Sequence, residues 1–120
     1  PSLSRAQKIQ KRASQVGFDW KSHDGPLDKI EEELLELRDS LSAGDRHQIK
    51  SELGDLLFSC VNLSRHLNLD AEESLRCATA KFEKRFVTME NEVGRSGRLI
   101  KDLSMEDYNA LWEKVKNPNL

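Results

Sequence analysis

The stretch that decides the fold runs from residue 27 to residue 57 and reads "LDKIEEELLELRDSLSAGDRHQIKSELGDLL". Leucine and isoleucine recur in it at spacings of three and four residues, which is the period of an amphipathic α-helix. The pattern is interrupted once, by "SAGD" at residues 42–45, where glycine and aspartate favour a turn. The stretch therefore predicts two helices joined by a short turn about Gly44.

The same helical spacing continues on both sides of this stretch, and period-two alternation is nearly absent. We predict an all-α fold of five helices, the last of them followed by Pro118. Four of the helices are preceded by a capping pattern, in which serine or aspartate is followed three residues later by glutamine, glutamate or aspartate. These pairs are Ser4 with Gln7, Asp45 with Gln48, Asp70 with Glu73, and Ser104 with Asp107.

Composition limits the class of protein. The chain has 120 residues, of which 37% are hydrophobic and 33% are charged, and its net charge is -2. This is enough for one domain with a modest core, expected to span residues 1–120. No apolar run approaches the ~20 residues of a bilayer span, and the charge balance gives no general attraction to nucleic acid. Because the chain starts at Pro1 rather than methionine, we expect a fragment of a longer chain.

The two cysteines indicate a compartment. Cys60 and Cys77 occupy apolar positions of predicted helices and form no CxxC pair. We interpret them as buried thiols in a reducing environment, which predicts a cytoplasmic protein.

The acidic residues of the opening stretch are crowded. Like charges at such spacing destabilise a helix, and a solvated surface is the ordinary explanation for them. Counted from Gly44, however, Glu36 lies as far before the turn as Glu52 lies after it, and Glu33 likewise matches Asp55. An antiparallel hairpin would therefore bring four carboxylates together. Oxygen ligands of this kind suit Mg²⁺, with Mn²⁺ as a substitute.

A second turn near Leu69 would bring basic residues to the same level. Lys81 and Arg85 lie four residues apart on one helix face, and their distances from this turn bracket that of Asp55. Acidic residues with a metal beside lysine and arginine are what a polyphosphate requires. The alternative for "KFEKR" is a surface charge lattice. Trp20 and Trp112 could each occupy a core or lid position, or could instead stack on a base. The aromatic residues of the 17–26 loop are expected to turn inward.

The residues resemble a known family. "EELLE" at residues 32–36 followed by "ELGD" at residues 52–55 resembles the EExxE and ExxD motifs of the all-α nucleoside triphosphate pyrophosphohydrolases. Within that superfamily the chain is most similar to the MazG family, and to the C-terminal domain of its two-domain bacterial members. This likeness covers nearly the whole chain, through "RAQKIQKRASQVGFDW", "ELGDLLFSCVNLSRHL" and "KFEKRF".

The resemblance implies a fold, a partner and a reaction. MazG proteins use Mg²⁺ to cleave nucleoside triphosphates to monophosphate and pyrophosphate, and they are homodimers with a four-helix-bundle core. The hairpin would supply part of that core. By position, the metal ligands are Glu33, Glu36, Glu52 and Asp55, and the nucleotide contacts are Lys29, Glu32, Asp55, Lys81, Arg85 and Trp112.

The expected mechanism assigns these residues separate tasks. The metal lowers the pKa of a water molecule, and Glu32 is the first candidate for the base that orients or deprotonates it. Glu36 is expected to be essential, and Lys81 and Arg85 neutralise charge on the departing pyrophosphate. The alternative is a helical module without catalysis, which would either dimerise or sense nucleotides.

Overall fold

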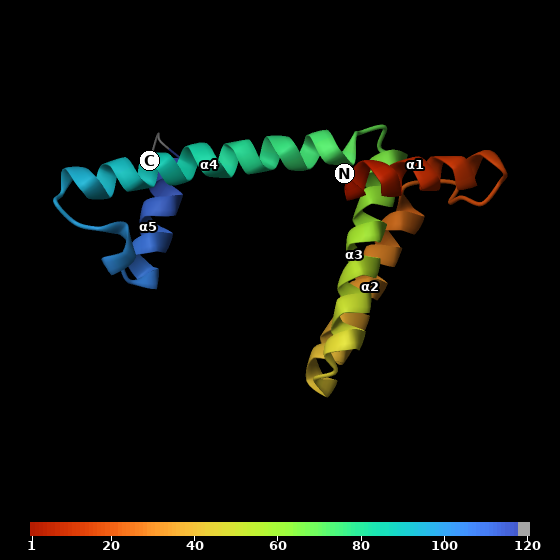
Figure 1. Cartoon of the computed structure of the whole chain (residues 1–120). Coiled ribbons are helices and arrows are strands. Elements are labelled where there is room, and N and C mark those ends of the chain that lie inside the picture. Colours follow the sequence, from red (N-terminus) through yellow and green to blue (C-terminus); the bar gives the residue numbers. More distant parts are fainter. Residues whose placement is uncertain (118–120) are drawn as a thin grey trace. The chain divides into compact units, whose positions relative to one another are not determined.

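The computed structural model describes residues 1–117, so the expected position of Pro118 lies outside the described residues. None of the described residues forms a β-strand, and the prediction of an all-α fold with five α-helices is confirmed (Figure 1). The elements are α1 (Ser2–Gln15), α2 (Asp24–Ala43), α3 (Arg46–His66), α4 (Ala71–Arg95), the 3₁₀-helix η1 (Ile100–Asp102) and α5 (Met105–Lys116).

The chain divides into two compact units. The first is Pro1–Ser74 and contains α1, α2 and α3, whereas the second begins at Leu75 and contains α5 and most of α4. Within residues 1–117, none of the helices combines the length and the apolar character that crossing a bilayer requires.

The turn about Gly44 forms as predicted. Gly44 adopts a left-handed conformation with φ of 78°, and its N–H donates to the carbonyl oxygen of Ser40 at 3.0 Å. Glycine is favoured here because other residues rarely adopt this left-handed conformation. Lack of space is not the reason, since a Cβ atom would meet nothing within 4 Å. The side chain of Asp45 then accepts from the backbone N–H groups of His47 and Gln48 and starts α3. The result is an antiparallel hairpin in which α2 and α3 lie side by side (Figure 1).

The other capping predictions have mixed outcomes. Ser104 forms the complete capping box at the start of α5. The Asp70 carboxylate accepts from the N–H of Glu72 at 3.0 Å, at the beginning of α4. The prediction for Ser4 is wrong, because α1 already begins at Ser2 and its first residues have no side-chain cap. The pattern formed by Ser4 and Gln7 therefore lies inside α1 and does not mark where this helix begins.

The buried face of the hairpin is polar. In α2 the buried residues are Pro26, Glu33 and Ser40, which are spaced by seven residues. In α3, Glu52 and Ser59 are buried at the same spacing. Seven residues are nearly two helical turns, so each set lies on one side of its helix. The buried positions of the two helices thus carry mainly glutamate and small serine side chains, whereas Leu37 and Leu56 are only half-buried.

Many leucine side chains of α2 and α3 remain uncovered. Leu35 and Leu57 are 62% and 52% exposed, and Leu34, Leu41 and Leu53 are also exposed. The buried hydrophobic side chains of the described residues are Val61, Ala71, Met89 and Val93. A helix with an uncovered apolar stripe has not yet buried the surface that stabilises it.

The exposure of other apolar residues contradicts two predictions. Cys60 and Cys77 are free and exposed, so the prediction of buried thiols is wrong. Phe18 is 82% exposed and Trp20 is half exposed, so the loop aromatics do not turn inward. In each case the residue is apolar, but the packing within residues 1–117 leaves much of its surface uncovered.

Candidate metal centre

Three glutamates converge inside the hairpin. Glu33 and Glu36 come from α2 and Glu52 comes from α3, and one carboxylate oxygen of each lies within 4.8 Å of the others. Glu33 and Glu36 share a helix face because they are three residues apart. The turn at Gly44 brings Glu52 opposite Glu36, as the count from the sequence predicted, and Glu33 joins them.

Two of these carboxylates are buried with unpaired oxygen atoms. Glu33 is 5% exposed and Glu52 is 8% exposed. The Oε2 atoms of both are buried and have no hydrogen-bond partner among the described residues. A buried carboxylate oxygen without a partner costs free energy, so native proteins rarely leave one unsatisfied. A bound cation would supply these carboxylates with the partner they lack.

The neighbouring polar side chains compensate this charge only in part. Lys29 Nζ lies 3.1 Å from Glu33 Oε1 and 3.3 Å from Glu32 Oε1. The hydrogen bond to Glu33 is the main cause that raises the pKa of Lys29. Gln48 Nε2 donates to Glu52 Oε1 at 2.7 Å. One ammonium group cannot neutralise all of these carboxylates, so the centre keeps excess negative charge.

This excess charge is reflected in Glu36. Its hydrogen bond with Glu52 and the negative charge of Glu33 raise the pKa of Glu36 to about 7. Near neutral pH a proton thus resides between carboxylates where a cation could replace it. The ligand atoms come entirely from carboxylates, which are the hard oxygen donors that Mg²⁺, Mn²⁺ and Ca²⁺ accept. The residues present fit a divalent cation of this class.

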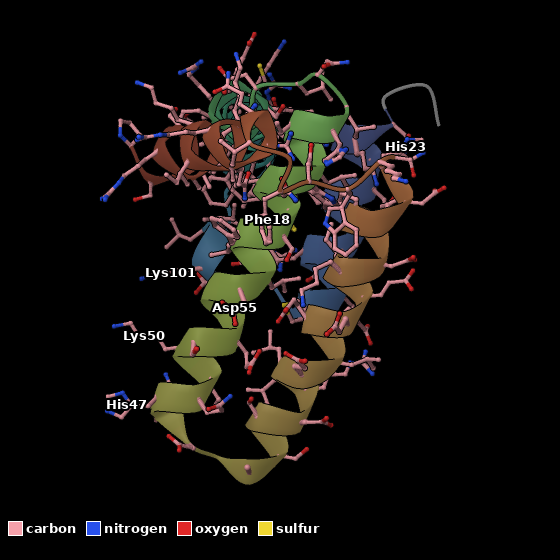
Figure 2. The ribbon with its side chains drawn as sticks, turned by 90° about the vertical axis from the view of Figure 1, so that its right-hand side faces the viewer. Phe18, His23, His47, Lys50, Asp55 and Lys101 are labelled. Atoms are coloured by element: carbon pink, nitrogen blue, oxygen red, sulfur yellow. The ribbon has the colours of Figure 1, made fainter. Side chains whose placement is uncertain are left out.

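The remaining predicted site residues are not members of this group of three. Asp55 is on α3, one turn beyond Glu52, and is exposed outside the group of three (Figure 2). Glu32 is exposed and paired with Lys29. The other predicted contacts belong to the second unit, so their approach to the carboxylates stays a prediction. These residues are Lys81, Arg85 and Trp112.

Two of these second-unit residues contact each other. The guanidinium carbon of Arg85 lies over the ring of Trp112, 5.5 Å from its centroid. Phe82 also contacts this indole, with 5.5 Å between ring centroids. The side chains of α4 and α5 thus form one aromatic and cationic group.

The chain also matches a known family model. Residues 21–88 match the MazG nucleotide pyrophosphohydrolase domain, and this range contains all four predicted metal ligands. This chain belongs to the MazG family. The resemblance noted from the acidic motifs is thereby confirmed.

Individual relatives extend the match along the chain. The Nucleoside triphosphate pyrophosphohydrolase/pyrophosphatase MazG of Thermotoga maritima is 51% identical over 97% of this chain and 44% of its own length. The Nucleoside triphosphate pyrophosphohydrolase of Escherichia coli K12 is 40% identical over 100% of this chain and 46% of its own length. The chain thus spans less than half the length of these MazG relatives.

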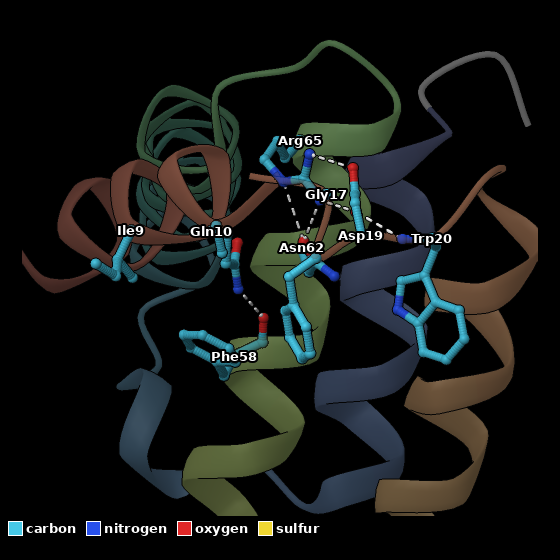
Figure 3. A pocket seen from close by; sticks show the side chains of 10 residues that line it. Ile9, Gln10, Gly17, Asp19, Trp20, Phe58, Asn62 and Arg65 are labelled. Carbon is cyan, nitrogen blue, oxygen red and sulfur yellow. Dashed lines mark hydrogen bonds and ion pairs between the residues drawn. The ribbon is translucent and has the colours of Figure 1, made fainter. Parts of the chain in front are cut away.

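The structure also contains a pocket that the sequence did not indicate. It has a volume of about 400 Å³ and lies between α1, the loop after α1, and α3 (Figure 3). Phe18, Trp20 and Phe58 contribute aromatic surface to it. Gln10 is buried beside it and donates to the carbonyl oxygen of Phe58 at 2.9 Å.

A polar network holds the loop of this pocket against α3. The Asp19 carboxylate accepts from Arg65 Nη2 at 2.5 Å and lies 2.8 Å from His66 Nε2. The Asn62 side chain accepts from the same Arg65. The hydrogen bond from Arg65 holds the pKa of Asp19 well below its usual range. Partners so far apart in sequence leave no local pattern, so the sequence alone could not pair them in this MazG chain.

Proposed function

We propose that this chain hydrolyses nucleoside triphosphates to nucleoside monophosphate and pyrophosphate with Mg²⁺. The observation that carries the proposal is the group of Glu33, Glu36 and Glu52, with its two buried and unpaired carboxylate oxygens. Membership of the MazG family supports the reaction class. We further propose that the reaction removes unwanted nucleotides in the cytoplasm, where the free thiols of Cys60 and Cys77 would stay reduced.

The residues of the hairpin divide the work. Glu33, Glu36 and Glu52 would hold the cation, and exposed Asp55 would join them or contact the substrate. When bound, the cation supplies Lewis-acid polarisation of the triphosphate and lowers the pKa of water. Glu32 lies beside the centre and is held by Lys29 at 3.3 Å. Its exposed carboxylate is our candidate for the base that takes the proton from the attacking water.

The basic residues of α4 would bind the phosphates. Lys81 and Arg85 are four residues apart, so they lie on one face of the helix. Their positive charge would stabilise the negative charge that grows on the departing pyrophosphate. Lys29 would assist from α2, next to the carboxylates.

The reaction class is tested by its products. Incubation of the chain with dNTPs and Mg²⁺ should release monophosphate and pyrophosphate in equal amounts, as measured by anion-exchange chromatography. Orthophosphate as the product would contradict the proposal. The same samples separate the alternatives: a nucleotide sensor would be stabilised against heat by Mg²⁺ and nucleotide without consuming the nucleotide. A module that only dimerises would respond to neither addition.

We also propose that the chain forms a homodimer. Its support is the exposure of Leu35 on α2 and Leu57 on α3, together with the other uncovered leucines of the hairpin. Exposed apolar surface of this kind typically marks an interface. A second copy of the hairpin would complete a four-helix bundle, in which each helix buries its stripe against others.

Replacing Leu57 by aspartate should therefore dissociate the dimer. Burying a charge in an apolar interface is strongly unfavourable, so sedimentation velocity should show a shift from dimer to monomer. Ser51→Asp is the matched control, because Ser51 is exposed on the same helix and lies about 120° from Leu57 around the helix axis. A wild-type chain that sediments as a monomer at high micromolar concentration would exclude the homodimer.

A further inference from the structure

The contact between Arg85 and Trp112 restrains the position of the arginine. The guanidinium carbon lies 5.5 Å from the centroid of the Trp112 ring, within the range of a cation–π interaction. Phe82 contacts the same indole and stacks on Phe86 with 6.1 Å between centroids. The indole is thus held by neighbours on α4, and it in turn restricts where the guanidinium can lie.

This contact orients Arg85 without neutralising it. Among residues 1–117, no carboxylate forms an ion pair with Arg85. The indole of tryptophan has an N–H donor but no acceptor atom, so it leaves the five N–H donors of the guanidinium available. Arg85 therefore presents a fixed fork of donors whose charge no described side chain has compensated.

Lys81 presents the same kind of uncompensated charge one turn away. Within the described part of the chain, it too lacks a carboxylate partner. Like charges four residues apart repel each other and destabilise a helix. An anion with several oxygen atoms would relieve this repulsion and could accept hydrogen bonds from both side chains. A polyphosphate has that chemistry.

We propose that Trp112 is a positioning residue, which acts on the phosphates of the substrate through Arg85 rather than on the base. The proposal rests on the proposed function in one respect, namely that this face of α4 receives the triphosphate. The competing role is stacking on the base. The ring face next to Arg85 is already occupied by the guanidinium, so a base placed there would displace the cation that the phosphates need.

The two roles differ in their dependence on the base. Inorganic tripolyphosphate has no base, so its affinity reports the phosphate contacts alone. Trp112→Leu keeps an apolar side chain but has no aromatic face. It should weaken tripolyphosphate binding by about 3- to 30-fold in calorimetry. It should also lower kcat/KM by the same factor for dATP and dCTP. Trp112→Phe keeps an aromatic face, so it should retain most of the wild-type affinity and kcat/KM.

A double variant shows whether the indole acts through the arginine. Arg85→Ala alone should weaken tripolyphosphate binding, and adding Trp112→Leu should then change the affinity less than twofold. Tyr108→Ala is the matched control, because Tyr108 also lies on α5 but donates its hydroxyl to the carbonyl oxygen of Ile100. This variant should leave tripolyphosphate affinity unchanged.

Three results would overturn the proposal. They are an unchanged tripolyphosphate affinity in Trp112→Leu, a larger loss for dATP than for dCTP, and losses that multiply fully in the double variant. A failure of the proposed function looks different. In that case the wild-type chain binds tripolyphosphate and loses affinity in Trp112→Leu, but releases no pyrophosphate from any dNTP.

Discussion

Replacing Glu36 by glutamine should lower the rate of triphosphate hydrolysis at least about 100-fold. Residues that only hold a metal ligand in place typically contribute about 10- to 100-fold, and a ligand itself should contribute at least as much. The substitution removes a negative charge and one oxygen ligand from the group formed with Glu33 and Glu52. The amide has nearly the same size, so the hairpin should be preserved. Pyrophosphate release at saturating Mg²⁺ measures the effect, and far-ultraviolet circular dichroism checks the helices.

Glu31→Gln is the matched control for this variant. Glu31 lies on the same helix and is exposed, and it is absent from the group of three carboxylates. Its loss should change the rate less than twofold. Full activity in Glu36→Gln, or an equal loss in Glu31→Gln, would show that the centre is misassigned.

The second large effect is on stability, which should depend on pH and Mg²⁺ together. The pKa of Glu36 is raised from 4.5 to about 7 by its neighbours. Between these values the folded chain retains a proton that the unfolded chain has released, so the free energy of unfolding should fall as pH rises through this window. Above about pH 7 this contribution to stability is lost, and the carboxylates repel each other fully.

Mg²⁺ should reverse this loss. At pH 8 a concentration a hundredfold above its dissociation constant should raise the melting temperature by roughly 10 °C. At pH 5 the shift should be much smaller, because protons compete for the same oxygen atoms. Differential scanning calorimetry measures both shifts, and the chain carrying Glu31→Gln should behave like wild type.

Glu36→Gln should flatten both dependences, because it removes the titrating group and a ligand. Without metal at pH 8, this variant should melt at a higher temperature than the wild-type chain, since it relieves repulsion. Equal Mg²⁺ shifts at pH 5 and pH 8 in the wild-type chain would contradict a carboxylate centre.

Much of the centre could be predicted before the fold was known. Helical spacing identified α2 and α3, and "SAGD" placed the turn because Gly44 tolerates a left-handed conformation. Once the turn is placed, the rise per residue of a helix sets the height of every side chain in the hairpin. That arithmetic brought Glu36 and Glu52 to one level, and in the structure they meet together with Glu33.

Other features needed tertiary contacts. The link from Asp19 to Arg65 and His66 joins residues with no shared local pattern, so it appears only when the loop meets α3. Likewise, spacing predicted Asp55 at the height of Glu33, but height does not fix direction. Asp55 instead lies exposed on α3, outside the three carboxylates.

The sequence by itself determined that the chain is helical, where its hairpin turns, and which carboxylates share a level. Those properties follow from backbone geometry and from interactions between near neighbours. Only the tertiary structure decided which of the level carboxylates meet and which apolar side chains stay uncovered. Glu33, Ser40 and Glu52 are buried in the hairpin, whereas Asp55 and Leu57 are exposed. The reason is that the rotation of a helix about its axis depends on all the surfaces that pack against it, and a single helical sequence does not contain them.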